Sequence, residues 1–329
     1  MSIVSASAPG KLMLLGEHAV VYGHPCIVTA VDLRIRAKVN VSKTGHVSIN
    51  SMNLHRPYIV SISELRNASV VPKEVRFVAI AIKRFWEYVG EYFGVEVTTQ
   101  SEFTESFGLG SSSAVTVATI KALSKATGYD MDESRIFSLG YETVLEAQEG
   151  VGSGFDIAAA SFGGTLYYVT GGKVITPMTV DNLPLVVGYS GNKADTTNYV
   201  KIVASRRQQF PTLVDTVMES IGTIVKRAKL VLKRGDYSKL GQLMNLNQGW
   251  LQALGVSTNE LDYLINISRL SGAYGSKLSG AGGGDCMVAL INEENRVAVE
   301  GGINYSNIPG AKVIRLRTNA EGVRIETNR

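Results

Sequence analysis

The chain has 329 residues, of which 45% are hydrophobic and 19% are charged, and its formal net charge is +4. This composition is that of a globular protein, and the length favours two domains over one. Because the charge excess is weak and Lys and Arg are scattered, a nucleic-acid-binding protein is a poor interpretation.

No uncharged apolar run is long enough to span a bilayer, so we expect no contact with a membrane. Residues Met1–Ser5 lack the basic and apolar regions of a signal peptide. The two cysteines, Cys26 and Cys286, both lie in apolar runs, which indicates buried free thiols in a reducing compartment. We therefore expect a cytoplasmic protein.

The first half of the chain predicts mixed strands and helices. Short strands over residues 3–7 and 11–15 flank a predicted turn at 8–10. Alternating side chains predict a half-buried strand within 26–41, and apolar residues at helical spacing predict a helix over 72–93. The other predicted elements are strands over 94–99, 165–169 and 185–189, and helices over 114–127, about 131–148, and a short one from 155.

The second half is mostly helical, with predicted helices over 196–209, 211–233, 237–246 and 258–270. A strand over 286–291, a further helix and a last strand over 312–316 complete the chain. We find no internal repeat and no disordered linker. A boundary near residue 180 would give domains over 1–180 and 181–329, which share a cleft.

Two loops of small residues are candidate phosphate sites. Gly108–Ser113 opens a helix, and backbone N–H groups at such a place bind anions. It lacks the Gly-Lys-Ser/Thr ending of a Walker A loop, and a simple capped helix is the alternative. Ser279–Gly284 contains four glycines in five residues, whereas a plain turn needs one or two. This density predicts backbone pressed against a ligand or against another backbone, or else a tight structural turn.

Single polar residues near these loops are weaker signals. Asp156 follows another loop of small residues, so its carboxylate could accept a hydroxyl proton or hold a metal ion. It could equally be a helix N-terminal charge that stabilises by about 0.3–1 kcal/mol. His18 beside Glu17 is most simply a core histidine, and Lys11 alone would be taken for a surface lysine.

Together these segments resemble the GHMP kinase superfamily, which includes galactokinases, homoserine kinases, mevalonate kinases and phosphomevalonate kinases. Ser7–Lys11 with Gly16–Gly23 is similar to the first motif of mevalonate kinases, Gly108–Ala114 to the phosphate-binding second motif, and Lys277–Gly284 to the third. Asn247 and Gln248, followed by Leu254–Val256, also resemble mevalonate kinases, chiefly archaeal ones.

The resemblance implies an α+β GHMP kinase fold with two domains. These are a ribosomal-S5-like N-terminal α/β domain and a ferredoxin-like C-terminal α+β domain, with the active site in the cleft between them. It also implies ATP-dependent phosphorylation of the 5-hydroxyl of mevalonate with Mg2+, in the pathway to isoprenoids. The partner would be a small molecule, and a homodimer is compatible with the family.

The resemblance also implies roles for single residues. Asp156 matches the catalytic aspartate near the substrate hydroxyl, and Lys11 matches the lysine that polarises this hydroxyl. The positions that match the substrate pocket are Glu17, His18, Ser153 and Thr196.

Nucleotide and metal positions follow from the second and third motifs. Ser112 matches a magnesium ligand, and a glutamate of the following predicted helix completes the metal site, with Glu146 preferred over Glu142, one helical turn earlier. The positions expected to bind ATP are Gly108, Leu109, Gly110, Ser111, Ser112, Ser113, Gly282 and Gly283.

Several features depart from the mevalonate kinase pattern. Thr104–Ser106 replaces the usual Pro-x-Gly, and the magnesium glutamate aligns only after a shift of one residue. The loop over 150–155 and Asp285, which ends the third motif, look more like phosphomevalonate kinases. The alternatives are therefore a phosphomevalonate kinase, a mevalonate-3-phosphate 5-kinase, a sensor without catalysis, or a decarboxylase. Candidate cations for a phosphorylated substrate are Lys193, Arg206 and Lys73.

Overall fold

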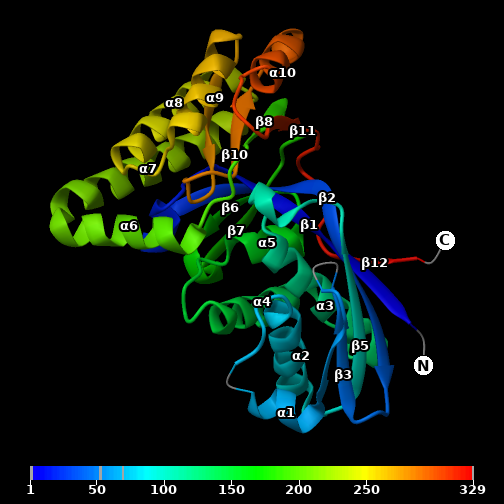
Figure 1. Cartoon of the computed structure of the whole chain (residues 1–329). Coiled ribbons are helices and arrows are strands. Elements are labelled where there is room, and N and C mark those ends of the chain that lie inside the picture. The colour runs from blue at the N-terminus through cyan, green and yellow to red at the C-terminus, as the bar shows by residue number, and fades with distance from the viewer. Residues whose placement is uncertain (1–2, 52–53, 69, 328–329) are drawn as a thin grey trace.

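The computed structural model describes residues 3–51, 54–68 and 70–327. Figure 1 shows two lobes, one with helices α1 to α5 and one with helices α7 to α10, and the long strands β1 and β2 run between them. The α+β architecture expected from the sequence is confirmed.

The first lobe is built on an eight-stranded sheet with the order β12-β1-β2-β5-β3-β4, and β6 and β7 continue from β2. The β3–β5 pair is parallel and the other pairs are antiparallel. The strands are β1 (Val4–Leu15), β2 (Pro25–Ser42), β3 (His46–Asn50), β4 (Tyr58–Ser61), β5 (Gly94–Ser101), β6 (Thr165–Val169), β7 (Val174–Met178) and β12 (Arg324–Glu326).

The predicted turn at residues 8–10 is wrong, because β1 is one continuous strand of 12 residues. Its register against β2 shifts between Pro9 and Gly10. A β-bulge accommodates a proline, which has no N–H to give to the sheet, without ending the strand. As a result β1 is long enough to bring Lys11, near its end, to the junction between the lobes.

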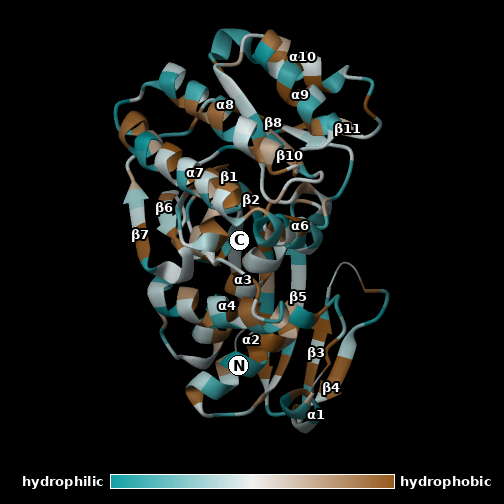
Figure 2. Cartoon of the chain, turned by 90° about the vertical axis from the view of Figure 1, so that its left-hand side faces the viewer, coloured by the Kyte–Doolittle hydropathy of each residue, from teal (hydrophilic) through white to brown (hydrophobic). Residues whose placement is uncertain are grey.

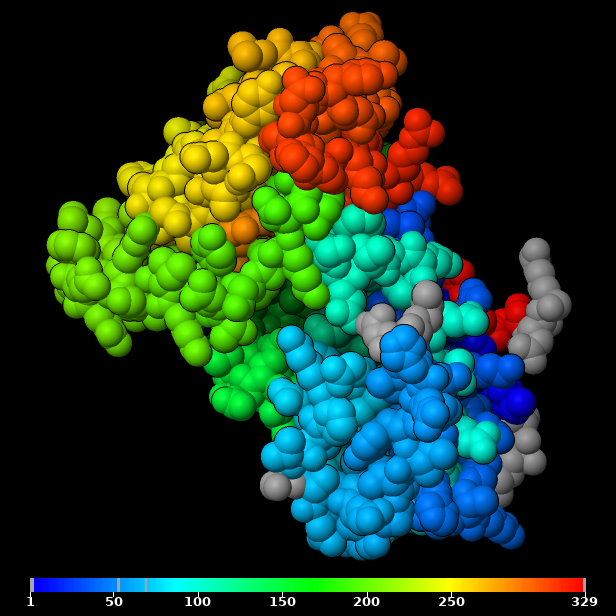
Figure 3. All heavy atoms as spheres, viewed as in Figure 1, coloured from blue at the N-terminus to red at the C-terminus, as the bar shows by residue number. Residues whose placement is uncertain are grey.

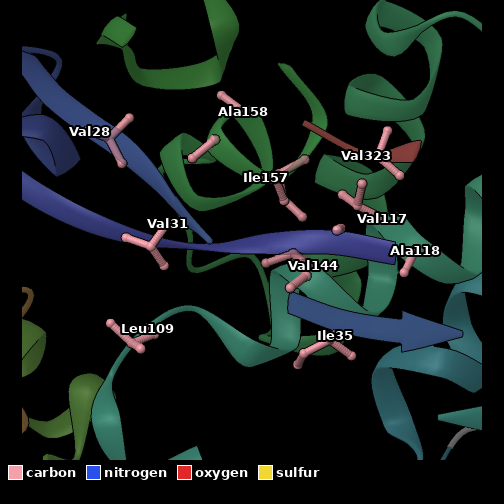
Figure 4. Packing of buried hydrophobic residues seen from close by; sticks show 14 of the residues in the cluster. Val28, Val31, Ile35, Leu109, Val117, Ala118, Val144, Ile157, Ala158 and Val323 are labelled. Carbon is pink, nitrogen blue, oxygen red and sulfur yellow. The ribbon is translucent and has the colours of Figure 1, made fainter. Parts of the chain in front are cut away.

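Helices pack on one face of this sheet. They are α1 (Ile62–Asn67), α2 (Arg76–Val89), α3 (Ser111–Thr127), α4 (Glu133–Ala147) and α5 (Phe155–Phe162). The predicted positions of α2 to α5 are confirmed to within a few residues at most ends, whereas α1 was not predicted. Figure 4 shows Val117 of α3, Ile157 of α5 and Val323 gathered beside β1, and all three are buried. Gly140 permits this packing, since a Cβ there would lie 3.2 Å from the Ile157 side chain.

The second lobe has an antiparallel sheet with the order β11-β8-β10-β9. Its strands are β8 (Leu185–Ser190), β9 (Gly275–Ser279), β10 (Cys286–Leu290) and β11 (Ala311–Ile314). Its helices are α6 (Thr196–Gln209), α7 (Pro211–Leu232), α8 (Tyr237–Ala253), α9 (Asn259–Leu270) and α10 (Arg296–Asn304). Single-turn helices are η1 (Ala19–Tyr22), η2 (Glu105–Phe107), η3 (Thr170–Gly172) and η4 (Glu293–Asn295).

Two predictions in this half need correction. Helix α8 does not end near residue 246 but continues to Ala253. The strand expected to be the last one is followed by β12, which pairs with β1 in the first sheet. Isolated bridges at Thr318 and Glu321 lead the chain back to that sheet. Three residues are too short a pattern to reveal a strand.

Helix α6 is mostly polar, as its predominantly teal colour in Figure 2 shows, and Val203 is its buried residue. The predicted state of the cysteines is confirmed, since Cys26 and Cys286 are both buried and free. Among the described residues, the helices are too short or too polar to cross a bilayer.

Arg34 attaches the returning C-terminal segment to the first sheet. Its guanidinium donates to Ser7 Oγ at 2.7 Å and to the carbonyl oxygens of Glu321 and Gly322 at 2.8 and 2.7 Å. Burial lowers the pKa of Arg34 to about 10, so the side chain remains charged at neutral pH. These bonds replace the water that a buried guanidinium and two carbonyl groups would otherwise need.

We predict that Arg34→Ala lowers the free energy of unfolding by about 2–4 kcal/mol, because it leaves these carbonyl groups without a donor. Arg36→Ala is the matched control, since Arg36 lies on the same face of β2 and is exposed. It should change the free energy by less than about 0.5 kcal/mol. Urea unfolding measures both, and equal values would contradict the role given to Arg34.

Candidate active site

A pocket of about 320 Å³ lies between the two lobes. Its walls come from the end of β1, the loop before α3, the loop before α5, the beginning of α6 and the glycine-rich third motif. The face shown in Figure 3 is hollowed between the green atoms of α6 and the blue-to-cyan first lobe. Small-molecule sites commonly have this size and lie where domains meet.

The loop before α3 presents open backbone donors to this pocket. Gly108 and Gly110 have φ of +66° and +77°, in the left-handed region that favours glycine. Gly110 is the N-cap of α3 and no side chain caps the helix, so the first N–H groups of the helix have no side-chain acceptor. Ser111 and Ser112 line the pocket at this helix end, which is a favourable place for phosphate oxygens.

Lys11 is held between this loop and Asp156. Its Nζ lies 3.1 Å from Asp156 Oδ1 and donates to the Gly108 carbonyl oxygen at 3.1 Å. Its backbone N–H donates to the Leu109 carbonyl oxygen at 2.9 Å, so strand and loop are joined directly. The Lys11 side chain is 8% exposed, and its orientation is therefore set by its partners.

Asp156 stands in the first turn of α5, after a loop that two tyrosines hold. Tyr168 and Tyr141 donate their hydroxyl groups to the carbonyl oxygens of Ser153 and Gly152, at 2.7 and 3.1 Å. Burial raises the pKa of both tyrosines, so both remain hydrogen-bond donors. This anchored loop places Ser153 and Asp156 at the pocket wall.

A buried ion pair joins the two lobes at the other end of the pocket. Lys277 Nζ of β9 contacts Glu17 Oε1 in the loop after β1, and both side chains are fully buried. Burial raises the pKa of Glu17 and lowers that of Lys277, and their mutual attraction opposes both shifts. Glu17 Oε2 has no hydrogen-bond partner among the described residues, and Glu17 lines the pocket. Glu17 Oε2 can accept a hydrogen bond from a hydroxyl group of a ligand.

His18 takes a left-handed backbone conformation, with φ +59°, and is 5% exposed. Its Nε2 lies 2.9 Å from the carbonyl oxygen of Ala281 in the third motif. Because a carbonyl oxygen only accepts, Nε2 carries the proton and donates. Burial lowers the pKa of His18, which keeps the ring neutral near pH 7.

Buried amides and a serine lock the same junction. Asn247 Oδ1 of α8 accepts the Gly16 N–H at 3.2 Å, and Gln248 Oε1 accepts the Leu278 N–H at 3.0 Å. Ser279 Oγ bonds both backbone groups of Met13, at 3.1 and 2.9 Å. The first and third motifs are therefore fixed relative to each other before any ligand binds.

Comparison with known proteins agrees with this geometry. Residues 76–164 match the model of the GHMP kinases N terminal domain, and residues 228–305 match the model of the GHMP kinases C terminal. The chain is 38% identical over 335 residues to a mevalonate kinase of Pyrococcus abyssi, with 98% of each chain covered. The chain belongs to the GHMP kinase family.

Solved structures of relatives have the same architecture. The mevalonate kinase of Methanococcus jannaschii superposes with a TM-score of 0.81 at 26% identity, over 98% of this chain and 99% of that one. The L. major mevalonate kinase in complex with R-mevalonate superposes with a TM-score of 0.77 at 26% identity, over 96% and 95%. The two-lobed fold of this GHMP kinase is thus that of its family.

Most residues expected at the site meet in this pocket between the lobes. Those that line it are Lys11, Glu17, His18, Gly108, Gly110, Ser111, Ser112, Ser153, Asp156 and Thr196. Leu109 in the same loop and Ser113 in the first turn of α3 are buried, at 1% and 4% exposure. Leu109 is part of the hydrophobic core, so its contribution to a ligand site is its backbone.

The expected ATP positions Gly282 and Gly283 are not among the pocket-lining residues, which in this motif are Gly280, Ala281 and Asp285. A Cβ at Gly282 would overlap the Val256 carbonyl oxygen, and one at Gly283 would overlap the Tyr199 ring. Both glycines therefore permit close packing against neighbouring protein.

The glutamates considered for magnesium lie elsewhere on α4. Glu146 pairs with Lys83 Nζ at 3.3 Å and with Arg84 at 2.6 Å, both from α2. Glu142 is exposed, and neither glutamate lines the pocket. We therefore do not assign either to the metal.

Among the candidate cations, Lys193 lines the pocket, 3.5 Å from Glu105 across the cleft. Arg206 instead donates to the Leu254 carbonyl oxygen, and Lys73 is not among the lining residues.

Sequence reasoning gave no role to Lys277. The available signal was that Lys277 lies between small and apolar residues. Such neighbours indicate burial, and a buried lysine requires a charged or hydrogen-bonding partner.

We predict that Lys277→Met lowers the free energy of unfolding of the kinase by about 3–5 kcal/mol, because Glu17 is left charged and unpaired in the interior. Adding Glu17→Gln should restore part of this loss, since it removes the stranded charge. Urea unfolding of the single and double variants measures the coupling. Additive losses would show that the two side chains do not stabilise each other.

His18 predicts a pH dependence of stability. Its folded pKa is below the ordinary value of 6.5, so below pH 6.5 the unfolded chain binds a proton that the folded protein resists. The His18 contribution is therefore present above pH 6.5 and is lost as pH falls, by at most about 1.4 kcal/mol per pH unit. In His18→Gln, the free energy of unfolding measured in urea should fall less steeply between pH 7 and 5 than in the wild type, because the His18 contribution is absent. His46→Gln, at an exposed strand position, should leave the slope as in the wild type.

Proposed function

We propose that this GHMP kinase transfers the γ-phosphoryl group of ATP to the 5-hydroxyl of mevalonate. The relatives of highest identity quoted above are named mevalonate kinases, and the open helix end at Gly110 offers a place for the nucleotide phosphates. The acceptor hydroxyl would lie at Lys11 and Asp156.

The charge of the pocket carries the choice of acceptor. The described lining residues include the carboxylates of Glu17, Glu105, Asp156 and Asp285 but only the ammonium groups of Lys11 and Lys193. Lys11 faces Asp156 and Lys193 faces Glu105. Little positive charge is left for an acceptor phosphate in addition to the phosphates of ATP. Mevalonate, with one carboxylate and two hydroxyl groups, fits this wall better than its phosphates.

The transfer needs positioning more than covalent chemistry. Asp156 accepts the proton of the 5-hydroxyl while the oxygen forms its bond to the γ-phosphorus and the bond to ADP breaks. Because this transition state is loose, little proton transfer is needed early, and orientation of the hydroxyl is the larger contribution. Lys11 donates toward the hydroxyl oxygen from its fixed place between Gly108 and Asp156.

The residues present also fit the magnesium ion of the family. Ser112 lines the pocket at the open end of α3, and its hydroxyl oxygen is a donor of the kind that Mg2+ accepts. The described part of the chain holds no cluster of three His, Cys, Asp or Glu side chains. One or two protein donors suffice for Mg2+, because phosphate oxygens and water complete its shell. When bound, the ion would neutralise phosphate charge.

We predict that Asp156→Asn lowers kcat by about 10²–10⁴-fold, because asparagine orients a hydroxyl less well and accepts no proton. Binding of a non-hydrolysable ATP analogue should change little, since the nucleotide amides are on another loop. Turnover close to that of the wild type would reject the assignment of Asp156.

The acceptor is decided by an ADP-release assay with mevalonate, mevalonate 5-phosphate and mevalonate 3-phosphate in parallel. We expect mevalonate to give the highest kcat/KM. If only a phosphorylated acceptor is turned over, that acceptor and not mevalonate is the substrate, which would agree with the features over 150–155 and at Asp285. ATP binding without turnover of any acceptor would indicate a sensor, and CO2 release would indicate a decarboxylase.

A further inference from the structure

Asp285 is a buried carboxylate at the pocket that the proposed transfer does not use. It ends the third motif, is 9% exposed, and lines the pocket. Its φ is +57°, a backbone conformation that is uncommon for a residue other than glycine. A buried acid in a strained conformation at a functional pocket requires a reason.

The backbone of Asp285 is joined to the loop between β8 and α6. Its N–H donates to the Asn192 carbonyl oxygen at 2.8 Å, and its carbonyl oxygen accepts the Ser190 N–H at 2.8 Å. Its side-chain Oδ1 accepts the Ala194 N–H at 2.9 Å. Three hydrogen bonds therefore fix this residue in the second lobe. The segment that it bonds to leads directly into α6, which begins at Thr196.

The other carboxylate oxygen faces the first lobe. A Cβ built on Gly108 would overlap Asp285 Oδ2. The segment Gly108–Ser113, proposed above as the nucleotide phosphate site and called the phosphate loop below, therefore rests against this carboxylate at a position where only glycine fits. The Lys11 ammonium holds the carbonyl oxygen of the same Gly108. Gly108 is thus located by a lysine of its own lobe and by an aspartate of the other.

We propose that Asp285 is a positioning residue that sets the phosphate loop of the first lobe against the α6 loop of the second. The shape of the side chain and its hydrogen bond to Ala194 do this, rather than its charge. Gly108 and the first N–H groups of α3 then hold the nucleotide phosphates in position for transfer to the acceptor hydroxyl. The inference rests on the proposed function only in taking this loop as the nucleotide phosphate site.

Two variants separate shape from charge. Asp285→Asn keeps the acceptor for the Ala194 N–H and tolerates a positive φ, but removes the charge. Asp285→Gly also tolerates the backbone, but leaves Ala194 without its acceptor and removes the support beneath Gly108. Asn307→Gly is the control for placing glycine at a positive φ, since Asn307 has φ +60° and is exposed.

The first readout is the Kd of a non-hydrolysable ATP analogue by calorimetry, which requires no acceptor. We expect Asp285→Gly to raise this Kd and the KM for ATP by about tenfold, the effect of one lost hydrogen bond of ordinary strength. The KM for mevalonate should change by less than about twofold, and Asp285→Asn and Asn307→Gly should stay within about threefold of the wild type.

Other outcomes overturn the proposal. If Asp285→Asn is as impaired as Asp285→Gly, charge is what acts. If Asp285→Gly binds the analogue as the wild type does, the side chain positions nothing. If ATP and mevalonate parameters fall together with the free energy of unfolding, the defect is a general structural one. If the wild type binds the analogue but does not phosphorylate mevalonate, the proposed function fails, and the Kd values still test Asp285.

Discussion

The site depends on one ammonium group that is held between a backbone carbonyl oxygen and a carboxylate of the first lobe. Lys11 Nζ reaches both the Gly108 carbonyl oxygen and the Asp156 carboxylate, at 3.1 Å each. Because the side chain is almost fully buried, these contacts are stronger than at a surface and restrict its motion. The phosphate loop and the predicted catalytic acid therefore share a common reference point on β1.

Polar contacts between the two lobes hold the junction around this point. The ion pair of Glu17 and Lys277 crosses from one lobe to the other, and buried amides at Asn247 and Gln248 hold the backbone beside it. Such pairs contribute little net stability, since desolvation offsets most of the attraction. Their value is in geometry, because a rigid site needs little rearrangement when a ligand binds.

Sequence patterns anticipated the main parts of the pocket for identifiable reasons. Gly108 and Gly110 are glycines because a left-handed backbone strongly favours glycine, and this preference is visible in the residue types themselves. The function of the third motif was harder to predict. Gly282 and Gly283 permit the close approach of Val256 and Tyr199, and the presence of a glycine does not indicate whether its neighbour is a ligand or protein.

The amino-acid sequence alone determined most helices and the small-residue loops, since these follow from local periodicity and from steric rules at glycine. The class of fold followed from the resemblance of its motifs to a known family. Tertiary structure decided that β1 continues through Pro9, that β12 returns to the first sheet, and that Glu146 pairs with Arg84 away from the pocket. It also decided that Lys277 finds Glu17, and that Asp285 meets Gly108 across the cleft. Contacts between residues far apart in the chain depend on how the lobes pack, and no local pattern records that.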